Sequence, residues 1–255
     1  MEGIAHEPWL PGAFNWVFGN VALWLAGLFG VELNHHRPIP DHVAMALIVA
    51  VLLVGFSWAM RNRYRLIPGP GQQVIELIVD FFRGLLLDVV GEKGAKYLPV
   101  VGTLGLFILA SNLIGLIPTC ASPTANLNVT VACAVTIFIY YHASGIREQG
   151  ILHYLKHFAG PIPALAPIVV PIEIISHFSR IVSLSVRLFG NIFGEDLVIL
   201  ILFSLVPLFV PLPMQFMALF TGVVQTFVFV MLSCIYIGGA IAAEEEDGHQ
   251  EAHSH

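Results

Sequence analysis

Long apolar runs alternate with short polar connections along this chain, and the lengths of the runs predict membrane-spanning helices. The clearest runs cover residues 42–60, 98–118, 127–145, 172–206 and 213–242. A helix needs about 20 apolar residues to cross the hydrocarbon core of a bilayer, which is ~30 Å thick. The pattern shows none of the strand-length alternation of a membrane β-barrel. We therefore predict an all-α polytopic membrane protein with about five membrane-embedded helices.

Two further segments are predicted to lie along the membrane surface. Residues 72–90 carry apolar side chains on one side, with Glu76, Asp80 and Arg83 between them, which is typical of an amphipathic surface helix. Residues 13–31 are apolar but interrupted by asparagines and glycines, and nearby tryptophans favour an interfacial position. We interpret the chain as one membrane domain, composed of an outer or interfacial segment (1–41), three spans with the surface helix (42–160), a hairpin (172–242) and an acidic tail (243–255).

The last two apolar runs are too long for ordinary spans. The first of them lies between Pro171 and Pro207, and its 35 residues would form a helix ~52 Å long. Ordinary tilts reach ~40°, which accommodates about 26 residues. This run therefore either kinks, near Gly190 and Gly194, or lies much flatter than a normal span. We expect a hairpin of two long, strongly tilted helices.

Composition supports a membrane protein and excludes several functions. The chain is 57% hydrophobic and 11% charged, whereas soluble domains carry roughly 25% charged residues. The net charge of −6 leaves no basic surface for nucleic acid. Nucleotide-binding glycine motifs and the ligand patterns of haem or iron–sulfur clusters are absent, and the three cysteines are interpreted as packing residues. We expect no cofactor, no metal and no directly bound nucleotide.

The distribution of lysine and arginine predicts the orientation. Eight of the eleven fall in segments that alternate to the same side of the membrane, and the positive-inside rule assigns that side to the cytoplasm. Five crossings then place the N-terminus outside and the C-terminus in the cytoplasm. No organelle signal is evident, which favours a bacterial inner membrane over a mitochondrial one and leaves a thylakoid membrane as the alternative. The eight residues are Arg61, Arg63, Arg65, Arg83, Lys93, Lys96, Arg147 and Lys156.

Arg187 is the most informative residue, because it lies inside a long apolar segment. A permanent cation at membrane depth costs about 2.5–3.5 kcal/mol on insertion scales. Arginine cannot avoid this cost by losing its proton. Arg187 therefore requires a carboxylate or a wet pocket nearby. It is either a functional cation or a packing residue paired with a neighbouring acid.

Other polar residues follow at helical spacing and form a row along the hairpin. Such a row could hold water and pass protons, or it could only bond the two helices together. His177 is either a proton relay or a packing residue. Three asparagines near the outer ends of the second and third spans could line an entrance, with helix capping as the alternative for Asn126. The row comprises Glu173, His177, Arg180, Arg187, Asn191, Glu195 and Asp196, facing Thr221, Gln225 and Tyr236, and the asparagines are Asn112, Asn126 and Asn128.

The sequence from Arg187 to Asn191, Arg-Leu-Phe-Gly-Asn, resembles the signature of subunit a of rotary F-type ATP synthases. The resemblance extends from about residue 42 to Glu246. Two further stretches are similar to the family, Ser122–Thr130 and Gln225–Tyr236.

This resemblance implies a proton-channel stator that faces a ring of c subunits and is held by peripheral-stalk b subunits, with no enzymatic activity of its own. Two half-channels would reach the ring carboxylates, and Arg187 would keep them apart as the ion gate. Glu173, Arg180 and Ser183 match the cytoplasmic path, Glu195 and Asp196 match the outer path, and Asn191 and Gln225 match polar neighbours of the arginine. The adjacent Glu-Asp pair, Ala218 and Gly115 depart from the family pattern and put the wiring of the outer path in doubt.

Two rival functions remain open. A secondary ion transporter would usually show inverted repeats, and no internal repeat is visible in this chain. A structural membrane subunit of a respiratory complex would not need an arginine that faces a partner. Co-purification with a c ring would separate both rivals from the stator.

Overall fold

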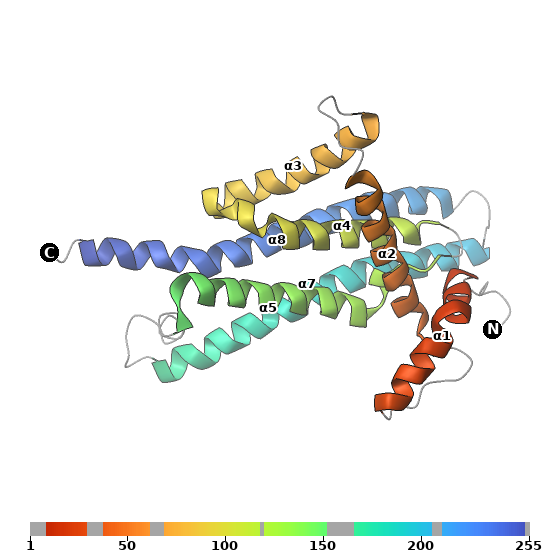
Figure 1. Cartoon of the computed structure of the whole chain (residues 1–255), viewed down its shortest axis with the longest axis horizontal. Coiled ribbons are helices and arrows are strands. Elements are labelled where there is room, and N and C mark those ends of the chain that lie inside the picture. The colour runs from red at the N-terminus through yellow and green to blue at the C-terminus, as the bar shows by residue number, and fades with distance from the viewer. Residues whose placement is uncertain are drawn as a thin grey trace. The chain divides into compact units, whose positions relative to one another are not determined.

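The computed structural model describes residues 9–29, 38–61, 69–117, 120–151, 166–205 and 211–252, and every regular element in these ranges is helical. Figure 1 shows the order of the elements. Five of the described helices are long and apolar enough to cross a membrane, which confirms the predicted all-α polytopic class. The α-helices are α1 (Trp9–Phe29), α2 (Asp41–Arg61), α3 (Pro70–Val90), α4 (Leu98–Gly115), α5 (Leu127–Gln149), α7 (Ala166–Leu205) and α8 (Pro211–Ala252), with short 3₁₀ turns η1 (Glu92–Tyr97) and η2 (Pro123–Ala125).

The predicted start of the long hairpin was wrong. The first helix was expected to begin after Pro171, but α7 begins at Ala166 and includes that proline. Proline lacks the backbone N–H that would bond four residues back, and so its presence in the sequence predicts a helix boundary. Pro171 lies near the helix start, where it removes a single hydrogen bond, and such prolines are tolerated in membrane helices.

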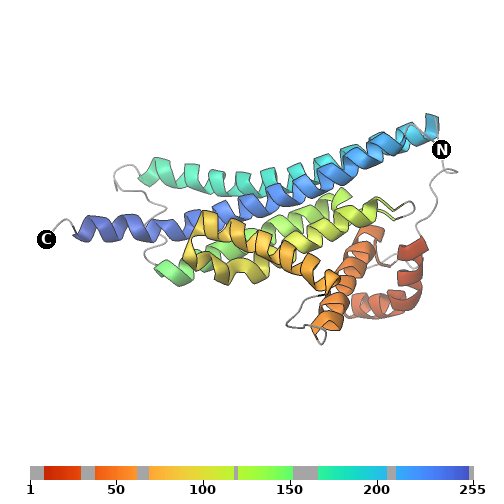
Figure 2. The same ribbon diagram turned by 90° about the horizontal axis from the view of Figure 1, so that it is seen from above.

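The second helix of the hairpin is longer than predicted at both ends. It begins at Pro211, since a proline in the first turn has no hydrogen bond to lose. It continues to Ala252, whereas the predicted helix ended at residue 242. Figure 2 shows α7 and α8 as unbroken helices, and at 1.5 Å per residue they are about 60 and 63 Å long. The helix continues through Gly190 and Gly194, the positions considered for a kink.

The chain divides into two compact units. The first unit combines Met1–Leu66, Leu106–Val129 and Leu188–Thr226. The second unit combines Ile67–Gly105, Thr130–Arg187 and Phe227–His255.

In the first unit, the side chain of Asn15 joins α1 to the turn before α2. Its amide nitrogen donates to the Ile39 carbonyl at 2.9 Å, and its amide oxygen accepts the Ile39 N–H at 3.0 Å. This reciprocal pair satisfies the backbone of a turn that would otherwise be unpaired. Nearby, Trp16 is 85% exposed, which suits a helix that meets the membrane interface.

In the second unit, α3 packs through the buried side chains of Phe82 and Leu86. The chain turns sharply where this helix ends. Gly91 closes the helix with a φ of +81°, a conformation that glycine adopts without strain. The opposite side of α3 exposes Val74, Leu77 and other large apolar side chains. The charged side chains of Glu76, Asp80 and Arg83 are exposed as well, which agrees with the amphipathic helix expected at 72–90.

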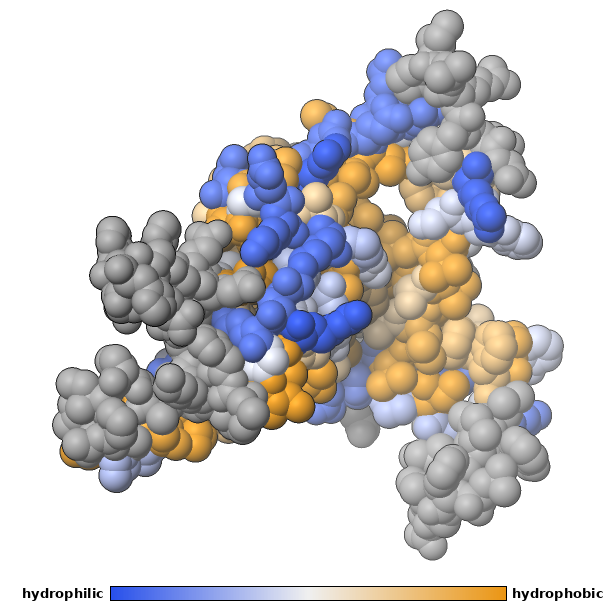
Figure 3. Space-filling view, turned by 60° about the vertical axis from the view of Figure 1, so that its left-hand side comes forward, coloured by the Kyte–Doolittle hydropathy of each residue, from blue (hydrophilic) through white to orange (hydrophobic). Residues whose placement is uncertain are grey.

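Large apolar side chains cover much of the described surface. They form broad orange areas in Figure 3, interrupted by hydrophilic patches. On α2, for example, Val54 is 70% exposed and Trp58 is 74% exposed. An apolar surface of this extent is expected where lipid replaces water around the helices.

Candidate functional site

Arg187 lies on an uncovered side of α7. Its guanidinium donates a 3.3 Å hydrogen bond to the Ser183 hydroxyl one turn earlier, and both side chains are exposed. Within the described ranges no acidic side chain pairs with it, so the alternative of a packing arginine joined to an acid is not observed there. Val186 and Gly190 are also exposed on this helix. A cation surrounded by exposed apolar and small residues is suited to meet a charge carried by another molecule.

In the first unit, Asn191 reaches across the hairpin. Its amide nitrogen donates to the Gln225 amide oxygen at 2.8 Å. Gln225 is buried, whereas Asn191 is exposed, so the bond holds the asparagine at the edge of the helix pair. Glu195 lies one turn further along α7 beside Thr221, and Asp196 follows it. The structure thus brings Asn191 and Gln225 together and keeps both acids partly accessible.

In the second unit, the polar side chains of Glu173, His177 and Tyr141 lie in contact one after another. The Nε2 atom of His177 is 3.2 Å from a carboxylate oxygen of Glu173, four residues earlier on α7. The Nδ1 atom of the same ring is 2.7 Å from the Tyr141 hydroxyl on α5. His142 lies beside this series, with its ring centre 4.8 Å from that of His177.

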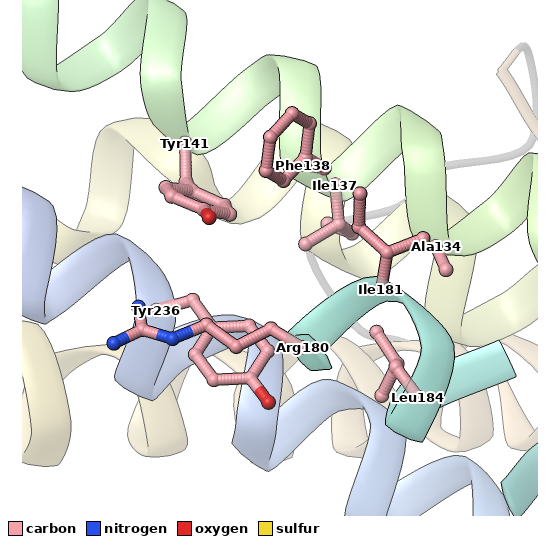
Figure 4. A pocket seen from close by; sticks show the side chains of 8 residues that line it. All are labelled: Ala134, Ile137, Phe138, Tyr141, Arg180, Ile181, Leu184 and Tyr236. Atoms are coloured by element: carbon pink, nitrogen blue, oxygen red, sulfur yellow. The ribbon is translucent and has the colours of Figure 1, made fainter. Parts of the chain in front are cut away.

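The same unit holds a small cavity between α5, α7 and α8. Figure 4 shows Arg180 from α7 extended along the ring of Tyr236 from α8, with Tyr141 from α5 above them. The guanidinium carbon of Arg180 is 5.2 Å from the Tyr236 ring centre, a distance at which a cation is attracted to an aromatic face. Apolar side chains, including Ile137, Phe138 and Leu184, line the remaining wall. The cavity therefore combines a cation and two phenols in apolar surroundings.

Sequence reasoning missed Tyr141 and His142. The only signal was the run Tyr140-Tyr141-His142, three aromatic or titratable residues inside an apolar span. That span has no regular row of polar residues, so the run alone does not predict a functional site. Helix α5 packs with Tyr141 toward the hairpin, and this side chain is therefore only 2% exposed.

The three asparagines expected near an entrance have different roles in the structure. Asn112 is buried, and its amide nitrogen donates to the Gly222 carbonyl at 3.0 Å, while its amide oxygen accepts the Thr124 hydroxyl at 2.6 Å. Asn126 precedes α5, and its side-chain oxygen accepts the N–H of Asn128 at 3.0 Å, which is the geometry of a helix N-cap. Asn128 is exposed.

Replacing Asn112 by alanine is expected to destabilise the protein by roughly 2 kcal/mol, because the Thr124 hydroxyl and the Gly222 carbonyl would lose a buried partner. Asn128→Ala is the matched control, since it removes an exposed amide from the same end of the spans. Thermal unfolding of the purified protein measures both. Equal midpoints for the two variants would contradict the structural role of Asn112.

The fold and these clusters define a helical membrane protein whose terminal hairpin carries titratable and hydrogen-bonding groups. Comparison with known proteins shows the family to which this chain belongs. The family model described as ATP synthase A chain matches residues 43–238, and the chain belongs to this family.

Several curated relatives agree with this assignment. "ATP synthase subunit a 2" of Syntrophotalea carbinolica is 46% identical over 213 residues, which cover 84% of this chain and 91% of that protein. "ATP synthase subunit a" of a Sulfurihydrogenibium species is 45% identical over 80% of this chain and 99% of that protein. The protein of the same name from a Sulfurovum species is 44% identical over 91% of this chain and 94% of that protein.

Proposed function

We propose that this chain is the proton-channel stator of an ATP synthase membrane sector. In this function it has no enzymatic activity alone, and it couples proton flow to the rotation of a ring of c subunits. The observation that carries the proposal is the uncovered Arg187, which has no acidic partner among the described residues and lies on the least buried of the five spanning helices. A partner with a membrane carboxylate would supply the missing negative charge.

Arg187 would act as the gate between two half-channels. A fixed cation attracts an arriving ring carboxylate and favours its ionised form, so that carboxylate releases its proton. A neutral carboxyl can turn into lipid, whereas an ionised one cannot do so cheaply. Each proton that crosses the membrane contributes ~2.3 kcal/mol per 100 mV, which drives rotation in one direction.

The other polar residues would form the two proton paths. In the second unit, Glu173, His177, Arg180, Ser183 and Tyr236 would line the cytoplasmic path. This assignment is supported by the Glu173–His177 contact and by the Arg180–Tyr236 stacking.

In the first unit, Glu195 and Asp196 would belong to the outer path, with Asn191 and Gln225 beside the gate. Asn112 is held in a buried hydrogen-bond network, so it would only shape the outer path. Asn126 caps a helix, so it would have the same limited role. Asn128, exposed beside them, would be the member nearest to water.

We further propose that the protein resides in a bacterial inner membrane, with its N-terminus outside and its C-terminus in the cytoplasm. The positive-inside distribution of lysine and arginine supports this orientation.

Peripheral-stalk b subunits would hold the chain against the ring. The whole chain would then act as one membrane domain, with the hairpin of 172–242 as its translocating part.

Cross-linking tests the contact with the ring. A cysteine at Val186, 50% exposed next to Arg187, is expected to cross-link to cysteines placed beside the membrane carboxylate of a c subunit. A cysteine at Ile139 on α5, 62% exposed, is the matched control and should not cross-link. Both are placed in a complex whose native cysteines are replaced by alanine. Equal yields at the two positions would contradict the proposed ring-facing side.

A further inference from the structure

Both ring nitrogens of His177 are engaged, and they are engaged by residues of different helices. Nε2 faces the Glu173 carboxylate on α7 at 3.2 Å, and Nδ1 faces the Tyr141 hydroxyl on α5 at 2.7 Å. Tyr141 is 2% exposed, and the His177 side chain is 12% exposed. The imidazole is therefore held from both ends in a nearly closed space.

The chemistry of a phenol explains what this arrangement can do. An ionised carboxylate only accepts hydrogen bonds, so Nε2 carries a proton when it faces ionised Glu173. In the neutral ring Nδ1 then accepts a hydrogen bond from the Tyr141 O–H. In the protonated ring Nδ1–H donates to the Tyr141 oxygen instead. A hydroxyl can donate or accept by rotating its hydrogen, so one residue suits both protonation states of His177.

On the basis of the proposed function, we propose that Tyr141 is a positioning residue for proton transfer through His177. It keeps the imidazole facing Glu173 while the ring gains and loses a proton, so that the ring need not reorient in each cycle. A phenylalanine at the same position would fill the space. It has no hydroxyl, so it could form a hydrogen bond with Nδ1 of His177 in neither protonation state of the ring.

The surroundings of His177 include other titratable and charged groups that any test must consider. On α7 these are Glu173 and Arg180, and on α5 they are Tyr141 and His142. On α8 Tyr236 adjoins the same group, with its ring centre 6.0 Å from that of Tyr141. His142 directs its Nδ1 to the Phe138 carbonyl of its own helix at 3.0 Å, so this atom is not available to His177.

The experiment compares Tyr141→Phe with Tyr140→Phe in the complete ATP synthase complex. Passive proton conduction through the membrane sector is measured in vesicles after the catalytic head is removed, and assembly is checked on native gels. Tyr141→Phe is expected to slow conduction about fivefold, a factor that corresponds to one hydrogen bond of ordinary net strength. Tyr140 contacts the ring of Tyr97, and the same change there should be tolerated. Equal rates for the two variants would overturn the proposal.

A double-mutant cycle separates positioning from general packing. If Tyr141 acts through His177, adding Tyr141→Phe to His177→Ala causes no further loss of conduction. Losses that multiply would show that Tyr141 acts independently, which overturns the proposal.

Nitrogen-15 spectra of histidine-labelled complex give a readout that needs no transport. The His177 signals, identified by their absence in His177→Ala, should report a hydrogen-bonded Nδ1 in the unmodified complex. Tyr141→Phe should shift them, and Tyr140→Phe should not. An Nδ1 without a hydrogen bond in the unmodified complex overturns the proposal even if Tyr141→Phe fails to assemble. ATP-driven pumping by complexes that keep the catalytic head separates the two proposals. Pumping that survives in Arg187→Ala contradicts the stator function, whereas pumping lost in Arg187→Ala together with unchanged passive conduction in Tyr141→Phe contradicts only the role of Tyr141.

Discussion

Complexes that carry Arg187→Ala are expected to assemble and to keep their ATPase activity, yet to pump protons at less than about one hundredth of the normal rate. The guanidinium is exposed on α7 and bonded only to the Ser183 hydroxyl among the described residues, so its removal leaves no buried partner unsatisfied. The stability of the subunit should therefore change little. The hundredfold loss corresponds to roughly 2.7 kcal/mol of barrier, which is comparable to the cost of an unpaired charge at membrane depth. ATP-driven acidification of inverted membrane vesicles measures the rate.

Val186→Ala is the control for this experiment. It shortens the neighbouring exposed side chain and leaves the charge in place, and pumping should stay within about twofold of normal, the range of a surface substitution. Pumping by Arg187→Ala near the normal rate would mean that the arginine is only a packing cation. The stator mechanism would then have to be abandoned in favour of a structural subunit.

Replacing Gly94 by alanine is expected to destabilise the protein by roughly 1–3 kcal/mol, the usual cost of overpacking. A Cβ atom at this position would lie 2.5 Å from the Leu86 carbonyl oxygen and 2.9 Å from its carbon. The obstacle is backbone, which cannot rotate away as a side chain can. Gly94 also donates its N–H to the Gly91 carbonyl at 2.8 Å, which fixes the sharp turn between α3 and α4. Thermal unfolding of the purified complex should show a midpoint lowered by several degrees.

Gly84→Ala provides the matched comparison. Gly84 lies within α3, and a Cβ atom there meets nothing within 4 Å. Alanine is favoured over glycine inside a helix by about 1 kcal/mol, so this variant should be as stable as the original protein or slightly more stable. A lowered midpoint for Gly84→Ala, or an unchanged one for Gly94→Ala, would contradict the close packing of the turn.

The spans and the surface helix could be predicted because apolar run length and amphipathic spacing are local properties of the sequence. The prediction of residues 42–60 matches α2 (Asp41–Arg61), and 72–90 matches α3 (Pro70–Val90). Helix ends depend on finer details. The predicted end of the third span at residue 145 was four residues early, because α5 continues to Gln149 and stops where Gly150 adopts a φ of +79°.

The candidate site was predictable along a helix but not between helices. Helical spacing alone placed Glu173 and His177 on one face, and the structure brings their side chains into contact. The partner of His177 across the helix pair could not be found in this way, because Tyr141 is separated from it by 36 residues and by the packing of α5. The orientation of Asn112 toward Gly222 likewise depends on tertiary packing and has no local signal.

The uncovered guanidinium of Arg187 also affects how the complex is built. A newly synthesised copy of this chain, alone in the bilayer, would expose an uncompensated charge to lipid at a cost of about 2.5–3.5 kcal/mol. Docking against a partner that bears a carboxylate would remove this penalty. The residue proposed to gate proton flow in the assembled complex would thus also make the unassembled subunit less stable than the assembled one. Biogenesis would then favour subunits that have joined the complex.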